Sequence, residues 1–77
     1  VVAIRRDHLG SRQRNDARAR MNRYLDLLRA ERERALGAGD TAAYNRATHE
    51  LFKQLEHAMR LNPRAGTARE LERLRTE

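Results

Sequence analysis

The chain has 77 residues, of which 17 are Lys or Arg and 11 are Asp or Glu, so its formal net charge is +6 at pH 7. This length allows one domain at most, and a domain so small buries only about 60% of its unfolded surface. The absence of cysteine excludes disulfides and thiolate metal sites. Oligomerisation is then the remaining common way to stabilise so small a fold.

No apolar run approaches the roughly 20 residues of a membrane span, and the four apolar residues at the N-terminus are too few for the core of a signal peptide. We therefore expect no membrane partner. We also expect a cytoplasmic location, which for a viral protein is the cytoplasm of the host cell. The chain begins at Val1 rather than Met, so either it was processed or a preceding segment is missing.

The excess positive charge is concentrated in the first third of the chain. Residues 1–23 hold seven Arg and two Asp, a net charge of +5, whereas residues 24–77 hold ten basic and nine acidic side chains. Because arginine-rich composition also accompanies GC-rich genomes, this uneven distribution carries more information than the arginine content itself.

Residues 1–11 form a basic N-terminal arm that we expect to be extended or partly ordered, with Gly10 as a break and Ser11 as the N-cap of the next element. The periodicity then predicts a helix over residues 12–36. Its apolar stripe, expected to face inward, includes Met21, Tyr24, Leu25 and Leu28. Leu27 lies on the opposite side of this helix.

A short turn over residues 37–40 follows, and it joins the first helix to a second predicted over residues 41–61. Gly37 is expected in the left-handed conformation that ends a helix, and Asp40 is expected to cap the next one. The second helix carries apolar residues over an arc of roughly 140°, including Leu51, Leu55 and Ala58, which we expect to face inward. This arc is wider than one packing contact needs, which indicates a second partner.

Residues 62–77 form a proline turn and a short C-terminal helix. Pro63 ends the second helix, because the residue before a proline is disfavoured in the α-helical region. Thr67 and Glu70 match a capping box for a third helix that carries Leu71 and Leu74. The predicted fold is therefore all-α: a long antiparallel helical hairpin over residues 12–61, with a basic N-terminal arm and a short C-terminal helix, which we expect to be oligomeric.

The sequence offers no catalytic or metal site. His49 and His57 lie eight residues apart, which is not the i, i+4 spacing of a zinc pair on a helix, and the lone His8 has no partner of this kind. The glutamates are interspersed with arginines, as in surface ion pairs. We therefore expect no enzyme, no cofactor and no bound metal.

The basic first third is the best candidate for a binding surface, because arginines neutralise phosphates and so supply sequence-independent affinity for nucleic acid. The alternative is that these arginines only solvate a long helix. The candidate residues that contact DNA are Arg5, Arg6, Arg12, Arg14, Arg18, Arg20 and Arg23. The candidate contacts between subunits are Leu27, Phe52 and Met59. Leu27 lies opposite the apolar stripe of the first helix, and the other two lie on one flank of the wide apolar arc of the second.

A long helix, a short acidic-glycine turn, a second helix and then Arg60-Leu61-Asn62-Pro63-Arg64-Ala65 resemble the C-terminal half of phage terminase small subunits. The resemblance covers roughly residues 15–74. It implies a non-enzymatic DNA-packaging protein that forms a homo-oligomeric ring, binds double-stranded viral DNA and presents it to the large terminase subunit. In such proteins the DNA-binding part often precedes the helical hairpin.

A second reading stays open, in which the chain is a small helical protein–protein interaction module, regulatory or antitoxin-like, that docks on another protein. The mass in solution distinguishes the two readings, because a ring of many copies favours the packaging adaptor and a monomer or dimer favours the interaction module.

Overall fold

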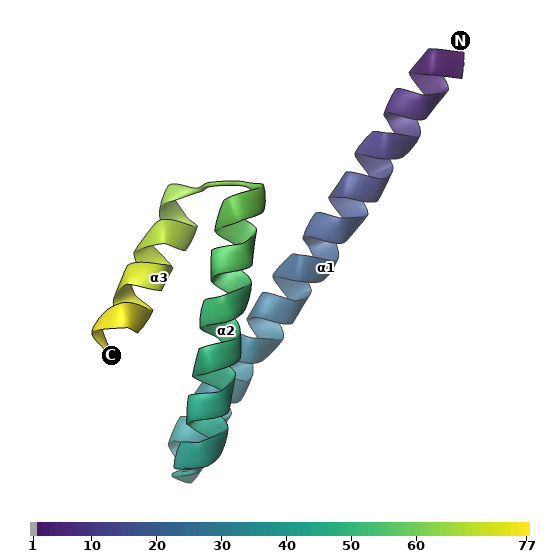
Figure 1. Ribbon diagram of the computed structural model, residues 1–77. Coiled ribbons are helices and arrows are strands. Elements are labelled where there is room, and N and C mark those ends of the chain that lie inside the picture. The colour runs from purple at the N-terminus through teal and green to yellow at the C-terminus, as the bar shows by residue number, and fades with distance from the viewer. Residues whose placement is uncertain (1) are drawn as a thin grey trace.

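The computed structural model describes the backbone of residues 2–77 and the side chains of residues 14–77. The elements are three α-helices, α1 (Val2–Ala38), α2 (Thr41–Leu61) and α3 (Ala65–Thr76). The part of the chain that the structure describes contains no strand, so the predicted all-α class is confirmed. Figure 1 shows α2 running back along the C-terminal part of α1, with α3 on the other side of α2.

The extended arm predicted for the N-terminus is wrong for residues 2–11, which are helical and continuous with the rest of α1. Gly10 and Ser11 lie inside the helix. An internal glycine costs only about 1 kcal/mol relative to alanine, and no proline interrupts this stretch, so neither residue forces a helix end. The N-terminal part of α1 stands clear of α2 and α3 (Figure 1), and the molecule is 57 Å long as a result.

The turn between α1 and α2 begins two residues later than predicted, because α1 continues to Ala38, whereas α2 begins at Thr41 as predicted. Gly37 is helical, and Gly39 is the residue with a positive φ of 70°. The amide of Gly39 donates to the carbonyl of Leu36, and the amide of Asp40 donates to the carbonyl of Ala35 at 2.9 Å. Gly39, the left-handed residue, thus directly precedes Asp40. The carboxylate of Asp40 accepts a hydrogen bond from the amide of Ala43 and so caps the N-terminus of α2.

The second helix ends where the sequence predicts, at Leu61 before Asn62 and Pro63. The predicted capping box of α3 does not form. Arg64 is the N-cap, in an extended conformation and without a side-chain hydrogen bond, so Thr67 already lies inside the helix. Because the extended residue Arg64 directly follows Pro63, α3 already begins at Ala65. Thr67 is then the third residue of the helix and cannot act as its N-cap.

Five leucines from all three helices form the core. Leu51 and Leu55 of α2 are completely buried and lie at its centre. Near the turn the two long helices are separated only by small buried side chains, including Ala35 and Ala43. The remaining core leucines are Leu25 from α1 and Leu71 and Leu74 from α3.

The inward face predicted for α1 and α2 agrees with the structure except at one position. Met21 and Leu28 pack against the core, and Ala58 is half-buried. Tyr24 was expected to face inward but is 40% exposed. Its hydroxyl donates to Glu50 of α2 at 3.1 Å, so the ring lies at the edge of the helix pair, where its polar end stays in water.

The wide apolar arc of α2 is covered within one chain. Phe52 and Met59 pack against the core cluster that contains the leucines of α3. The guanidinium of Arg75, also from α3, lies 5.8 Å from the centre of the Phe52 ring. The second partner that the width of the arc indicates is therefore α3, and no second subunit is needed to explain it.

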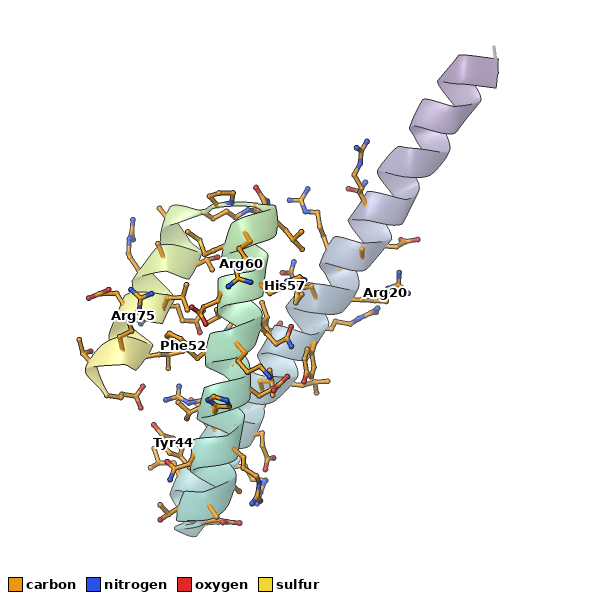
Figure 2. All side chains as sticks on the ribbon, in the orientation of Figure 1. Arg20, Tyr44, Phe52, His57, Arg60 and Arg75 are labelled. Carbon is orange, nitrogen blue, oxygen red and sulfur yellow. The ribbon has the colours of Figure 1, made fainter. Side chains whose placement is uncertain are left out.

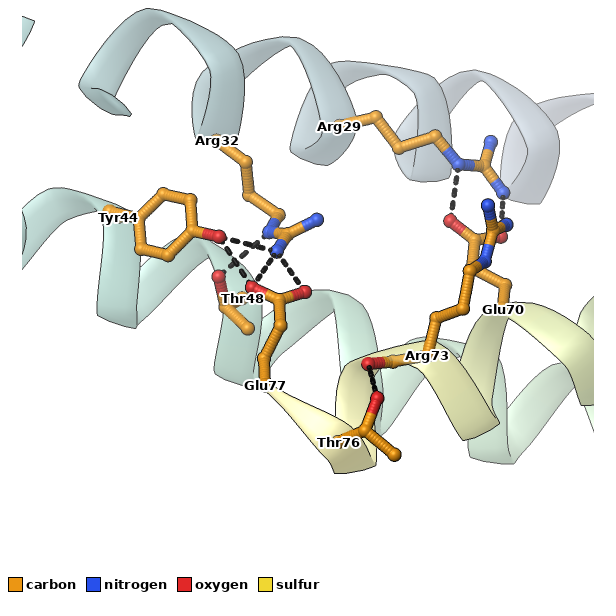
Figure 3. A network of polar contacts seen from close by, with 8 residues as sticks. All are labelled: Arg29, Arg32, Tyr44, Thr48, Glu70, Arg73, Thr76 and Glu77. Atoms are coloured by element: carbon orange, nitrogen blue, oxygen red, sulfur yellow. Dashed lines mark hydrogen bonds and ion pairs between the residues drawn. The ribbon is translucent and has the colours of Figure 1, made fainter. Parts of the chain in front are cut away.

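Polar contacts join α3 to α1 across the core (Figure 3). The guanidinium of Arg29 forms two hydrogen bonds with the Glu70 carboxylate, at 2.9 and 2.7 Å, and lowers the pKa of that carboxyl below its usual range. One turn further along α1, Arg32 bonds the Thr48 hydroxyl and the Glu77 carboxylate at 2.7 Å and lies over the Tyr44 ring. The bidentate Arg29–Glu70 contact and the Arg32–Glu77 ion pair thus tie the middle and the C-terminal end of α3 to α1.

Candidate nucleic-acid interface

Four of the seven arginines predicted to bind DNA have described side chains, and all four are exposed on α1: Arg14, Arg18, Arg20 and Arg23. They lie on the part of α1 that extends toward and past the end of α2, and Arg20 points away from α2 in Figure 2. The side chains of Arg5, Arg6 and Arg12 lie outside the described residues.

The exposed arginines of α1 do not share one face. At 100° per residue, Arg20 and Arg23 project on the side opposite the core, about 60° apart. Arg14 and Arg18 instead project on the same side as the core leucines, and Arg18 lines a groove between α1 and α2. A straight duplex therefore cannot contact all four from this helix at once.

Helix α2 presents a basic stripe that the sequence analysis did not assign. Its residues recur at spacings of three and four, which places them within an arc of about 80° on the outer face of the helix. All five are exposed, and the arc contains no carboxylate; Glu50 and Glu56 border it. Figure 2 shows His57 and Arg60 projecting from this face. The α2 stripe consists of Arg46, His49, Lys53, His57 and Arg60.

The cations of the stripe differ from those near the turn in having no ion-pair partner among residues 14–77. The ion pairs in that region use Arg29, Arg32, Arg34 and Arg75, which are neutralised by nearby glutamates and by Asp26. Arg34, for example, bonds Glu31 at 2.6 Å and lowers the pKa of that carboxyl. The positive charge available to a ligand therefore includes the stripe, the α1 arginines, and the arginines at and after Arg64 that form no ion pair among residues 14–77.

The two histidines of the stripe are exposed and lie about two turns apart on the same solvent-facing side. In the described part of the chain, no three His, Asp or Glu side chains come together in a way that could hold a metal ion. His8 falls outside the described side chains. At the stripe, the histidines add polar groups beside the arginines and the lysine.

The candidate inter-subunit residues lie in different environments. Leu27 is 68% exposed on the outer face of α1, where it is available for a contact with another molecule. Phe52 and Met59 pack on the core of their own chain, so less of their surface is available to a neighbour. Of the three, Leu27 is the candidate that the single chain leaves open.

No helix among the described residues has the length and apolar character needed to cross a membrane. Comparison with known proteins gives no match: no protein family, curated protein sequence or solved structure is significantly similar to the chain.

Proposed function

We propose that the protein is a non-enzymatic DNA-binding adaptor that self-assembles, contacts the phosphates of double-stranded DNA and presents the DNA to a large packaging enzyme, as terminase small subunits do. The observation that carries the DNA-binding part is the α2 stripe, a continuous row of exposed basic side chains without ion-pair partners among the described residues.

The spacing of the stripe supports a phosphate contact. Its permanently charged members, Arg46, Lys53 and Arg60, recur every seven residues, which separates them by about 10 Å along the helix. Cations in such a row can each contact a phosphate while the helix lies against the duplex. No aromatic side chain lies within the stripe, so stacking on single-stranded bases is not its mode of binding.

Self-assembly supplies the affinity that one chain lacks. Three or four phosphate contacts bind DNA weakly, and repetition of the same contact in a homo-oligomer raises the effective concentration of each further contact. Leu27, exposed on the outer face of α1, is the proposed inter-subunit anchor.

The packaging role rests on the resemblance of the helical hairpin and of the Leu61-Asn62-Pro63 turn to terminase small subunits. The observed turn, in which α2 ends at Leu61, Asn62 and Pro63 follow and a short helix begins at Ala65, supports this reading. A large terminase subunit is the partner that it implies.

The test measures the affinity of the full chain for two unrelated 30-base-pair duplexes across a salt series. Replacing Arg46, Lys53 and Arg60 together with Gln should lower the log–log salt slope by about 2.7, because each phosphate contact contributes about 0.9. The wild-type advantage over this variant should then shrink about 40-fold between 50 and 200 mM salt. Both duplexes should be affected equally.

Two companion variants separate the basic surfaces. The first variant tests the α1 arginines in the same assay by replacing Arg12, Arg20 and Arg23 with Gln. If it and the α2 triple variant both have a smaller salt slope than wild type, both helices belong to the interface. Arg34→Gln is the control, because it removes an arginine that is already paired with Glu31. An unchanged slope in both triple variants refutes DNA binding by these surfaces.

Light scattering tests self-assembly. A wild-type monomer at tens of micromolar refutes the self-assembling adaptor.

A further inference from the structure

A groove of about 350 Å³ lies where α1 diverges from α2, at the end of the core opposite the interhelical turn. Its floor is apolar and comes from both helices, with Ala17 and Met21 on α1 and Ala58 and Leu61 on α2. Leu61 is 70% exposed although it is the last apolar side chain of α2. The chain itself therefore leaves an apolar surface uncovered at this end.

Both charged side chains on the rim of the groove are positive. They are Arg18 from α1 and Arg64 from the turn before α3, with His57 of α2 as a further polar group, and no described Asp or Glu lines the groove. The cleft beside Arg29, nearer the turn, differs in that the arginines there are paired with carboxylates. An occupant of the open groove must therefore combine an apolar face with negative charge.

The packing of α3 within the same chain provides an example of such an occupant. There α3 places Leu71 and Leu74 in the core shared with α1 and α2, while Glu70 reaches the guanidinium of Arg29. An amphipathic helix with leucines flanked by glutamates is thus the ligand that these helices already bind within the chain. The open groove offers a similar combination, with apolar side chains beside an exposed arginine, Arg18.

We propose that this groove binds an acidic amphipathic helix of another protein, with its apolar residues on Met21 and Leu61 and its carboxylates on Arg18 and Arg64. The apolar floor favours a protein helix over nucleic acid, because a phosphate placed over it loses water without gaining a hydrogen bond. Charge disfavours the packing of two such grooves against each other in a homodimer, because Arg18 and Arg64 would then face like charges. This inference does not depend on DNA binding.

The test uses the full chain and three labelled synthetic helical peptides in a fluorescence-anisotropy titration. The first has a leucine stripe flanked by glutamates, the second has lysine in place of each glutamate, and the third has serine in place of each leucine. The first should bind at least about tenfold more tightly than either of the others, since both the apolar and the charged contacts are required. Equal binding of the first two peptides, or of the first and third, overturns the proposal.

Two variants, each with a matched control, test whether the peptide binds in the groove. Leu61→Glu should weaken binding of the glutamate–leucine peptide at least about tenfold. Leu36→Glu changes an equally exposed leucine outside the groove, one to which no binding role is given, and should leave peptide binding unchanged. Arg18→Gln combined with Arg64→Gln should weaken binding of the glutamate–leucine peptide, whereas Arg34→Gln should not. Circular dichroism of each variant checks that its helices are intact.

Two other outcomes would assign the groove to a different occupant. If Leu61→Glu abolishes binding of a 30-base-pair duplex while the glutamate–leucine peptide does not bind wild-type protein, the groove is a nucleic-acid site and the proposal is wrong. If Leu61→Glu instead dissociates a wild-type oligomer, measured by light scattering, a second copy occupies the groove, and the proposal is also wrong.

Discussion

The fully buried Leu55 provides the sharpest test of the fold, because its loss can be compared with that of an exposed leucine on the same helix. Leu55 is 1% exposed at the centre of the core, and truncation to alanine leaves a cavity between α1, α2 and α3. Leu55→Ala should cost about 2–5 kcal/mol. A chain of 77 residues has a total stability of roughly 4–12 kcal/mol, so this one change should remove a large fraction of it.

Leu61→Ala is the matched control, since it makes the same chemical change six residues along α2 at a side chain that is 70% exposed. Its cost should stay within about 0.5 kcal/mol, as for other surface substitutions. Urea unfolding followed by circular dichroism at 222 nm measures both variants against wild type. The midpoint should fall strongly for Leu55→Ala alone, with the slope unchanged. Equal losses for the two variants would show that the register of α2 is wrong.

Three further predictions concern the turn and the contact between α1 and α3. Gly37→Ala should stabilise the fold by up to about 1 kcal/mol, because Gly37 is helical. Gly39→Ala should cost about 1–2 kcal/mol, because the φ of Gly39 is +70°. Equal shifts of the melting temperature in the two variants would contradict the observed turn. Asp40→Ala should cost about 1 kcal/mol by removing the cap of α2, measured by urea unfolding. Because Arg29 lowers the pKa of Glu70, their contact stabilises the fold fully above about pH 4.3 and is lost as the pH falls through the lowered pKa. Glu70→Gln should therefore flatten the acid side of the curve of melting temperature against pH, and superimposable curves would exclude the contact.

The bounds of α2 were predictable because both ends are set by local chemistry. Asp40 can cap only a helix that begins directly after it, and Pro63 disfavours the helical conformation at Asn62. The end of α1 was not predictable to the residue, because Gly37 and Gly39 can each adopt the left-handed conformation. In the structure Gly39, directly before the cap residue Asp40, is the one of the two that adopts it.

The candidate binding surface was only partly predictable, because net charge over a segment hides which charges are paired. Residues 24–77 have nearly balanced charge, which suggested that the basic surface lies elsewhere. In the folded chain Glu31, Glu70 and Glu77 bond arginines near the turn, and these pairs join residues up to 45 positions apart. The cations of the α2 stripe, in contrast, have no ion-pair partner among residues 14–77. The recurrence of basic residues at spacings of three and four along α2 was the available signal.

The different lengths of the two long helices explain why the candidate contacts gather at one end of the molecule. With 37 residues against 21, α1 exceeds α2 by 16 residues, or about 24 Å of helix that α2 does not accompany. The core contacts of α1 among the described residues begin at Met21, and the groove opens where they end. An isolated helix of that length is marginal in water, so the N-terminal part of α1 gains stability from any ligand that binds along it. Phosphates on its arginines and an acidic helix in the groove would each stabilise this segment, and either would supply the packing partner that the short α2 does not provide.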